Sequence, residues 1–542
     1  MNIVVNKDIE ELIKFLTKEF NSNLVSHKIN STNHIQFVIE KNYLPSAVEY
    51  ISKSSELKTH LITMLASDER ISNESFKIYV TFAITQPKAI LTLEVLLDKN
   101  NPSYPALSKI IPSLNWHERE IHDLFGIVPV GIELDPLVLH RDWPHGKYFP
   151  MRNDFTLNKR FPFGEVTHEF SQQPHGEGMH QIAVGPIHAG IIEPGHLRFC
   201  TIGEEIYKFD AQLFYKHKGI EKMASGKNIE EVLTLSEHVC GMCAFSHSSG
   251  FCQAVENLGN IEIPQRAAYL RTICLELERI SNHMADLMSI CSAGGLGFGA
   301  NHAARLREVL MRLNHEFAGH RFFRNLNTIG GLKKNITDES CNLLLEKFEK
   351  FKPQFQEWEQ LIINSDSLLD RLELTGFLSN ENAIKLGLVG PAARASNVDI
   401  DIRRDYPYLA YEDCMVKVPV YEDGDALART QVRIDEVYES LRIIKNLING
   451  LPSGSIVDHT PVKYALLMPS VSMIESAKGE LAHFIILDEE NKISRWHVRS
   501  ASYMNWRGVV QATMGQDGFK NIVPDGPLIN KSFNLCYACV DR

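Results

Sequence analysis

The apolar positions in the first part of the chain predict a small unit that contains both helix and sheet. Charged and apolar residues are mixed at helical spacing over residues 1–16, which favours an amphipathic helix. Segment 115–127 mixes aromatic and charged residues near the end of this unit. Runs rich in β-branched and aromatic residues lie between these segments and favour half-buried strands at 35–40, 76–84 and 90–97. We therefore predict an α+β domain over residues 1–155.

The later part of the chain has the apolar spacing of long helices. Apolar residues recur every three or four positions between Pro264 and the pair Gly294 and Gly295, which is typical of a long helix with a proline start and a glycine stop. A second apolar stripe follows over 306–317, and residues 335–375 are predicted to be helical as well.

From about residue 382 onward the pattern is mixed. Short strands are predicted at 465–469 and 482–487. We therefore expect a mainly α-helical domain with small β elements over residues 181–542. Residues 156–180 are rich in turn formers and are predicted to be a linker.

Composition and charge narrow the classes of function. At 542 residues the chain exceeds what one hydrophobic core usually organises, so two domains are expected. A formal net charge of −11 argues against nucleic acid as the main partner. No run of apolar residues is long enough to span a bilayer, and the first residues do not read as a signal peptide, so we predict a cytoplasmic protein.

The cysteines divide into two kinds. Ten cysteines in a long cytoplasmic chain argue against a disulfide framework. Six of them stand alone in apolar or mixed surroundings and are predicted to be small buried hydrophobic residues: Cys200, Cys252, Cys274, Cys291, Cys341 and Cys414. The other four form two CxxC pairs.

The two CxxC pairs predict a soft metal site. Cys240 and Cys243 share one face of a helix or helical turn with His247, and the second pair is Cys536 and Cys539. Four converging thiolates suit zinc, nickel or an iron–sulfur cluster. The 292 residues between the pairs (244–535) weaken a zinc-ribbon interpretation, because such sites have far shorter gaps. His247 is either a satisfied core histidine or a donor to a ligand sulfur.

Two further segments contain titratable residues. Residues 185–199 form a turn-rich stretch that holds Glu193, which is either a capping acid or a carboxylate held beside a metal. Glu278, Arg279 and His283 lie in a predicted helix, where their spacing suggests ion pairs on a helix face.

These residues together resemble a known family. CGxCxxxH at 240–247 with CxxC at 536–539 resembles the nickel-iron hydrogenase large subunit. Its complex I-related branch is similar to this chain in GPIHAGIIEPGHLRF (185–199), YKHKGIEK (215–222), LELERISNH (275–283) and RSASYMNW (499–506). The C subunit of complex I is similar in 115–127 and 142–155, and its D subunit resembles 170–542. A fusion of the two that keeps both cysteine pairs resembles the formate hydrogenlyase type.

The resemblance implies a nickel-iron centre with cyanide and carbonyl ligands on the iron. Cys240 and Cys536 would be terminal nickel ligands, while Cys243 and Cys539 would bridge nickel and iron. Glu193 would exchange protons with the Cys536 thiolate, and His247 would hydrogen-bond a bridging sulfur.

Two positions depart from the family's pattern. Glu221 would bind a magnesium or iron ion near the C-terminus, although Arg542 stands where the family has a histidine ligand. Lys478 replaces an arginine that would donate to the cyanide ligands, and it lacks the planar fork of an arginine.

The function implied is reversible reduction of protons to H2 with electrons from formate oxidation.

The implied partners are a small iron–sulfur protein similar to the B subunit of complex I, a ferredoxin-like subunit, formate dehydrogenase, a membrane arm of antiporter-like subunits, maturation proteins and a C-terminal protease. The resemblance places the chain on the cytoplasmic face of the inner membrane, and it implies that Arg542 is a processed C-terminus. The alternatives are a metal-free, quinone-binding C/D fusion of complex I and a zinc-stabilised scaffold.

Overall fold

The N-terminal part of the fold is a five-stranded sheet with helices on one face. The computed structural model describes residues 7–140, 142–156, 160–164, 176–189 and 192–542. The sheet order is β1-β2-β5-β4-β3, parallel between β2 and β5 and antiparallel elsewhere. Its strands are β1 (Leu24–Ser31), β2 (His34–Ile39), β3 (Thr59–Glu69), β4 (Ser75–Ile84) and β5 (Ala89–Asp98).

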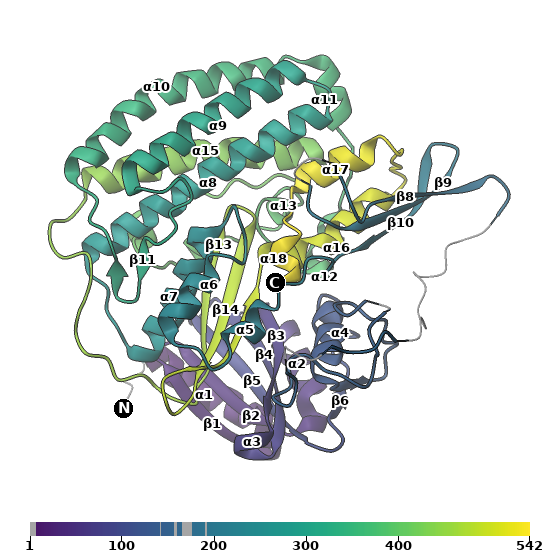
Figure 1. Cartoon of the computed structure of the whole chain (residues 1–542), viewed down its shortest axis with the longest axis vertical. Helices are drawn as coiled ribbons and strands as arrows, with labels where there is room; N and C mark the ends of the chain where they lie inside the picture. The colour runs from purple at the N-terminus through teal and green to yellow at the C-terminus, as the bar shows by residue number, and fades with distance from the viewer. Residues whose placement is uncertain (1–6, 141, 157–159, 165–175, 190–191) are drawn as a thin grey trace.

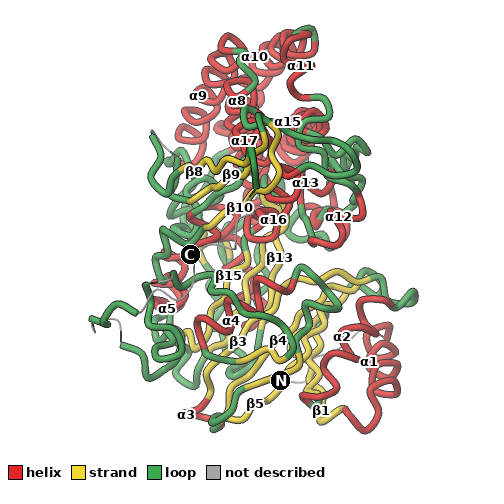
Figure 2. The backbone as a smooth tube through the Cα atoms, turned by 90° about the vertical axis from the view of Figure 1, so that its right-hand side faces the viewer, coloured by secondary structure: helices red, strands yellow, loops and turns green. Residues whose placement is uncertain are grey.

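Helices α1 (Lys7–Phe20) and α2 (Leu44–Lys53) lie on the outer face of this sheet (Figure 2). Their buried apolar side chains share one core with the strands, as the amphipathic pattern predicted. Short elements complete the region: 3-10 helices Asn21–Asn23 and Lys41–Tyr43, α3 (Arg70–Asn73), α4 (Leu114–Phe125), β6 (Ser103–Pro105) and β7 (Val128–Val130). The predicted linker lies largely outside the described residues.

A bundle of long helices forms the opposite end of the molecule (Figure 1). The proline start and glycine stop predicted for the first long helix are confirmed, with Pro264 as its N-cap and Gly294 as its C-cap. The bundle consists of α8 (Gln265–Ala293), α9 (Gly297–Ala318), α10 (Asp338–Ile363) and α15 (Ala426–Asn449). The chain therefore has a sheet-containing N-terminal part followed by a helix-rich part, as expected.

Between the sheet and the bundle lies a second, three-stranded sheet. It has the order β13-β14-β15 and is antiparallel. The prediction of a strand at 465–469 is wrong, because β13 begins only at Ser470. Leu467 has a positive φ of 60°, and Pro469 has no N–H to donate to a ladder. The strands are β13 (Ser470–Ser476), β14 (Gly479–Leu487) and β15 (Ile493–Arg499).

The remaining elements surround this middle sheet. A third sheet, β10-β9-β8, projects beside the C-terminal helices (Figure 1). Its strands are β8 (Met179–Val184), β9 (His196–Ile202) and β10 (Glu205–Gln212). The other elements are α5 (Ile220–Ala224), α6 (Ile229–Ser236), α7 (Ala244–Gly259), β11 (Asn327–Thr328), β12 (Gly331–Leu332), α11 (Asp366–Leu372), α12 (Asn380–Leu386), α13 (Gly390–Arg394), α14 (Ile402–Asp405), the 3-10 helix Tyr411–Asp413, α16 (Ala501–Met514), α17 (Asp525–Phe533) and α18 (Ala538–Asp541).

The N-terminal sheet and the rest of the chain share their cores. Ile62, Leu65 and Tyr79 belong to the same buried cluster as the helices of the bundle. The ring of Tyr79 lies 4.9 Å from that of Phe484 on β14, measured between centroids. No helix among the described residues has the length and apolar character needed to cross a membrane.

Candidate metal centre

The two cysteine pairs meet where α7 faces the C-terminal helices. Cys240 and Cys243 lie in a bend that leads into α7 rather than within a helix, with Cys243 as the N-cap of α7. His247 lies in the first turns of α7. Cys536 precedes α18 and Cys539 lies inside it. None of the ten cysteines, all within the described residues, forms a disulfide, and the six lone ones are buried as predicted.

The cysteine sulfurs form a compact, buried cluster. The Sγ atoms of Cys240 and Cys536 are 3.7 Å apart, although 296 positions separate the two residues. The sulfurs of Cys240, Cys536 and Cys539 all lie within 4.8 Å of one another. Cys243 lies beside Cys240, whose thiol it hydrogen-bonds. The structure therefore brings together the four cysteines that the sequence singled out.

The cluster disfavours more than one thiolate at a time. Hydrogen bonds from Cys243, Cys536 and Cys539 lower the pKa of Cys240 well below its usual value. The same contacts with Cys240 raise the pKa of Cys243 and Cys536, and burial raises the pKa of Cys539. One thiolate is thus favoured and further ones are disfavoured, because negative charge would accumulate in a buried site. Four buried sulfurs with this need for positive charge fit a soft metal centre.

Glu193 lies directly against the C-terminal cysteine pair. Its Oε2 is 3.5 Å from the Sγ of Cys536 and accepts the backbone N–H groups of Tyr537 (3.0 Å) and Ala538 (2.8 Å). Its Oε1 lies 3.4 Å from the Nζ of Lys216. The Glu193 side chain is 27% exposed, so one carboxylate reaches from a cysteine sulfur toward solvent.

A glycine allows this close approach. A Cβ atom added to Gly195 would lie only 2.5 Å from Cε1 of Tyr537, so any larger residue would collide with the ring. The loop that holds Glu193 can therefore pack against residues 536–538. The sequence showed this glycine only as a turn former.

His247 is part of a chain of buried rings. The indole Nε1–H of Trp496 donates to Nδ1 of His483 at 3.1 Å, and Nε2 of His483 lies 3.2 Å from Nδ1 of His247. Burial lowers the pKa of His247 to about 4 and the pKa of His483 well below its usual value, so both rings are neutral. Because an indole can only donate, Nδ1 of His483 must accept, and the proton of the neutral His483 ring lies on Nε2. From there it is donated in a hydrogen bond to Nδ1 of His247. The remaining proton of His247 is then on its Nε2.

The sequence did not identify His483 or Trp496 as members of this chain of rings. A lone histidine in an apolar strand gives no sign of its partner. The rings of His247 and His483 can lie this close only because α7 has a glycine beside them. A Cβ atom at Gly250 would lie 2.9 Å from Cδ2 of His483. The ring chain therefore exists only through the packing of α7 on β14.

Lys478 lies in the turn between β13 and β14 and is buried. Its Nζ forms an ion pair with Asp286 of α8, which also accepts Nε of Arg433 at 2.9 Å. The positive charge of Lys478 opposes the rise in the pKa of Cys243, which puts this ammonium within electrostatic reach of the sulfur cluster. The position predicted to face the iron thus holds a fixed positive charge.

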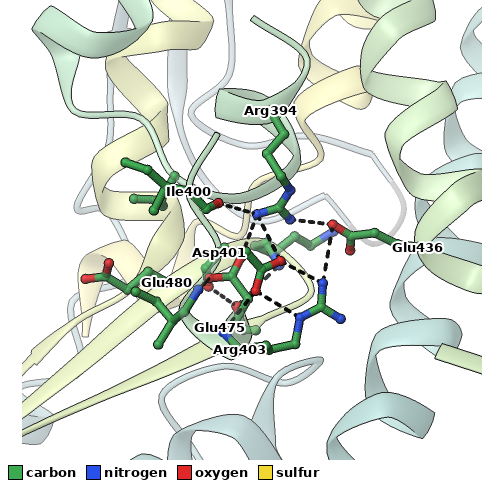
Figure 3. A network of polar contacts seen from close by, with 12 residues as sticks. Arg394, Ile400, Asp401, Arg403, Glu436, Glu475 and Glu480 are labelled. Carbon is green, nitrogen blue, oxygen red and sulfur yellow. Dashed lines mark hydrogen bonds and ion pairs between the residues drawn. The ribbon is translucent and has the colours of Figure 1, made fainter. Parts of the chain in front are cut away.

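A network of buried ion pairs lies around Arg394 and Arg403 (Figure 3). Arg394 pairs with Glu436 and Glu475, and Arg403 pairs with Asp401 at 2.7 Å. Within the described residues, five carboxylates and five cations make two sets of ion pairs here: Glu276, Asp401, Glu436 and Glu475 with Arg279, Arg394 and Arg403, and Asp286 with Arg433 and Lys478. Matched charges of this kind let a buried network persist.

The predicted helix-face ion pairs of residues 275–283 belong to the protein interior. Arg279 and His283 both contact Glu436 within the buried network. Glu278 has a separate role that the sequence did not reveal. Its carboxylate accepts the backbone N–H groups of Phe245 (2.8 Å) and Ser246 (3.0 Å), which follow the bend of the first cysteine pair. Glu278 therefore fixes the start of α7 and the position of that pair.

Glu221 is placed differently from the expectation of a second metal. It lies with Glu120 and His497 in a buried cluster, but the guanidinium of Arg542 lies among them and pairs with both carboxylates. Arg495 pairs with Glu221 as well, at 2.8 Å. Two guanidiniums therefore pair with these carboxylates at the place where the second metal was expected, and that expectation stays a prediction.

Comparisons with known proteins agree with this architecture. Residues 298–467 and 468–542 match the family of the respiratory-chain NADH dehydrogenase 49 Kd subunit, and residues 37–161 match that of the 30 Kd subunit. Residues 218–290, which include Cys240, Cys243 and His247, match the nickel-dependent hydrogenase family. Formate hydrogenlyase subunit 5 of Escherichia coli is 31% identical over 97% of this chain and 92% of its own length. The chain belongs to the formate hydrogenlyase-type family of nickel-iron hydrogenase large subunits.

Other relatives place this hydrogenase family beside complex I. Hydrogenase-4 component G of Escherichia coli is 29% identical and covers 98% of this chain and 92% of its own length. The C/D subunit of the NADH-quinone oxidoreductase of Bacteroides fragilis is 31% identical over 74% of this chain and 79% of its own length. A solved archaeal membrane-bound sulfane sulfur reductase is similar with a TM-score of 0.61 and 25% identity, covering 68% of this chain and 100% of that one. The family thus includes members of several respiratory membrane complexes.

Proposed function

We propose that this chain is the catalytic large subunit of a nickel-iron hydrogenase that reduces protons to H2, reversibly, with electrons that come from formate oxidation. One observation carries the proposal: the Glu193 carboxylate lies 3.5 Å from the Cys536 sulfur at the edge of a buried four-cysteine cluster. A proton carrier beside a soft metal site is what proton reduction requires.

The proposed cofactor is a nickel-iron pair whose iron carries cyanide and carbonyl ligands. Cys240 and Cys536 would bind nickel alone, and Cys243 and Cys539 would bind both metals. When bound, this pair supplies the electrons and the electrophilic site at which protons are reduced. The ammonium of Lys478 would lie on the side of Cys243, as a point charge toward anionic ligands of the iron.

The residues around the cluster handle protons and orient sulfur. Glu193 accepts a proton from outside and delivers it to the sulfur of Cys536, because its carboxylate touches both that atom and the partly exposed side near Lys216. Two backbone N–H groups hold its Oε2 in place. His247 would use its Nε2 proton to hydrogen-bond the sulfur of a cysteine that holds the metals, and His483 maintains the tautomer that this requires.

The proposed partners follow from the family rather than from the described residues. We propose that electrons arrive through a small iron–sulfur subunit and a ferredoxin-like subunit, from formate dehydrogenase. A membrane arm of antiporter-like subunits would hold the chain at the cytoplasmic face of the membrane. Maturation proteins and a C-terminal protease would load the centre.

The metal content of the purified protein tests this function. We expect one nickel and one iron per chain, cyanide and carbonyl bands in the infrared spectrum, and hydrogen–deuterium exchange activity. The matches to complex I subunits favour a second candidate, a metal-free quinone-site subunit. Protein without nickel that binds a quinone would support that candidate, and stoichiometric zinc in place of nickel would support a structural site; either result would overturn our proposal.

The ring chain gives a prediction for His483→Phe. The variant loses the donor to Nδ1 of His247, so the tautomer of His247 is no longer fixed. We expect nickel and iron to be retained, the cyanide and carbonyl bands to shift, and activity to fall by about 10–100-fold, as is usual when a partner of a metal-site residue is removed. The exposed His459→Phe is the matched control. Unchanged infrared bands together with full activity would show that His483 has no positioning role.

A further inference from the structure

The cluster of Glu120, Glu221 and His497 has the form of a metal site. These residues come from α4, α5 and β15, and one ligand atom of each lies within 4.8 Å of the others. All three side chains are at least nine-tenths buried. Two carboxylates and one imidazole at this spacing are a donor set for a divalent cation.

The histidine of this cluster directs one ring nitrogen toward a carboxylate of the cluster. Nδ1 of His497 lies 3.1 Å from Oε1 of Glu221, yet it has no properly oriented hydrogen-bond partner among the described residues. Its other nitrogen, Nε2, lies 3.1 Å from Oγ1 of Thr63. Burial lowers the pKa of His497, so the ring is neutral, the form in which histidine binds metals.

The cations in this cluster are side chains: Arg542 and, 2.8 Å from Glu221, Arg495. One terminal nitrogen of Arg542 lies 3.1 Å from Oε1 of Glu221, and the other donates to Oε2 of Glu120. The guanidinium also donates to the carbonyl of Val498 and lies 5.1 Å from the ring centre of Tyr503. Burial alone would raise the pKa of Glu221, but its polar neighbours, the Arg542 guanidinium among them, hold it well below its usual value.

The main chain beside Arg542 is held on both sides. The carbonyl of Arg542 accepts the N–H groups of Lys218 (2.7 Å) and Gly219 (3.0 Å). The carboxylate of Asp541 accepts those of Phe214 (2.8 Å) and Lys216 (2.7 Å). The segment that carries the second cysteine pair is thereby tied to residues next to α5 and, through the Arg542 side chain, to the N-terminal sheet region.

We propose that the Arg542 guanidinium substitutes for a divalent metal ion. The surrounding metal-ligand residues bind this side chain, and the segment with the second cysteine pair is thereby held in place without a metal. Arg542 is a positioning residue in this proposal, and the site behind it is a latent divalent-cation site. The inference goes beyond the proposed hydrogenase function and does not depend on it, because the Glu120, Glu221 and His497 ligand atoms are distinct from the sulfurs.

The test measures Mn²⁺ binding to the full-length protein by electron paramagnetic resonance. It also measures the effect of Mn²⁺ on the thermal unfolding of the protein. We expect Arg542→Ala to bind one Mn²⁺ at least about tenfold more tightly than the wild type, and its Tm to rise with Mn²⁺. The double variant Arg542→Ala with Glu221→Gln should lose this site. Arg70→Ala is the matched control, since it also removes one arginine that pairs with two carboxylates, here Asp68 and Asp154.

Two results would overturn the proposal. One is stoichiometric Mn²⁺ bound by the wild type and lost in Glu221→Gln, because the site would then take a metal despite Arg542. The other is Arg542→Ala that gains no Mn²⁺ site. If Arg542→Ala does not fold without added metal, folding of this variant in the presence of Mn²⁺ supports the proposal. Failure to fold with Mn²⁺ present contradicts it. Neither readout involves nickel, so a failure here is separate from a failure of the hydrogenase function.

Discussion

Serine in place of Cys240, Cys243, Cys536 or Cys539 will reduce hydrogen evolution to background and leave the nickel-iron centre absent or incomplete. The sulfurs converge in a buried cluster in which Cys240 and Cys536 are only 3.7 Å apart. A serine hydroxyl is a hard ligand that stays protonated at neutral pH, so it cannot replace a thiolate toward nickel. Nickel and iron analysis, infrared spectroscopy and hydrogen evolution of each variant measure the effect.

Cys414→Ser is the matched control for this series. Cys414 is buried like Cys240, Cys243 and Cys539, and its Sγ lies 3.1 Å from the carbonyl oxygen of Ala410, which a serine hydroxyl can also reach. This variant should keep both metals and its activity. Full activity in any of the four ligand variants would remove that cysteine from the proposed centre.

Glu193→Gln will keep the metals but lose most turnover. A glutamine oxygen can still accept the N–H groups of Tyr537 and Ala538, so the geometry beside Cys536 should persist. The amide cannot exchange a proton at working pH, and general acid–base groups typically contribute about 10²–10⁴-fold. We expect a loss of that size in hydrogen–deuterium exchange, measured beside metal content.

Glu205→Gln is the matched control, because Glu205 is an exposed acid that pairs with Lys520 on the surface. It should leave exchange unchanged. Normal exchange in a metal-replete Glu193→Gln protein would exclude Glu193 as the proton carrier. Loss of metal in that variant would instead indicate a structural role for the carboxylate.

The long helices and the main strands could be predicted because their signals are local. Pro264 and Gly294 mark the ends of α8 directly in the sequence. The strand at 465–469 was predicted wrongly because apolar composition does not reveal the backbone conformation of Leu467. The sheet of β8, β9 and β10 and the short helices carry weaker periodicity, and their order depends on packing across the molecule.

The candidate site was predictable where residue type alone carries the chemistry. The cysteine pairs indicate a soft metal, and the resemblance supplied Glu193. The partners of these residues were not predictable, because His483, Trp496 and Glu278 become significant only through contacts between distant elements. The contact of Arg542 with Glu120 was not predictable for the same reason, because Glu120, on α4, lies 422 positions earlier in the chain.

The separation between these contacts also sets an order of events during synthesis. Residues 536–542 leave the ribosome after every element that they touch, including α4, α5, α7 and β15. Closing loops of 296 positions for Cys240–Cys536 and 422 for Glu120–Arg542 costs conformational entropy that only the final contacts repay. The elements that this segment touches can therefore fold before it docks, and until it does Cys240 and Cys243 lack their contacts with Cys536 and Cys539.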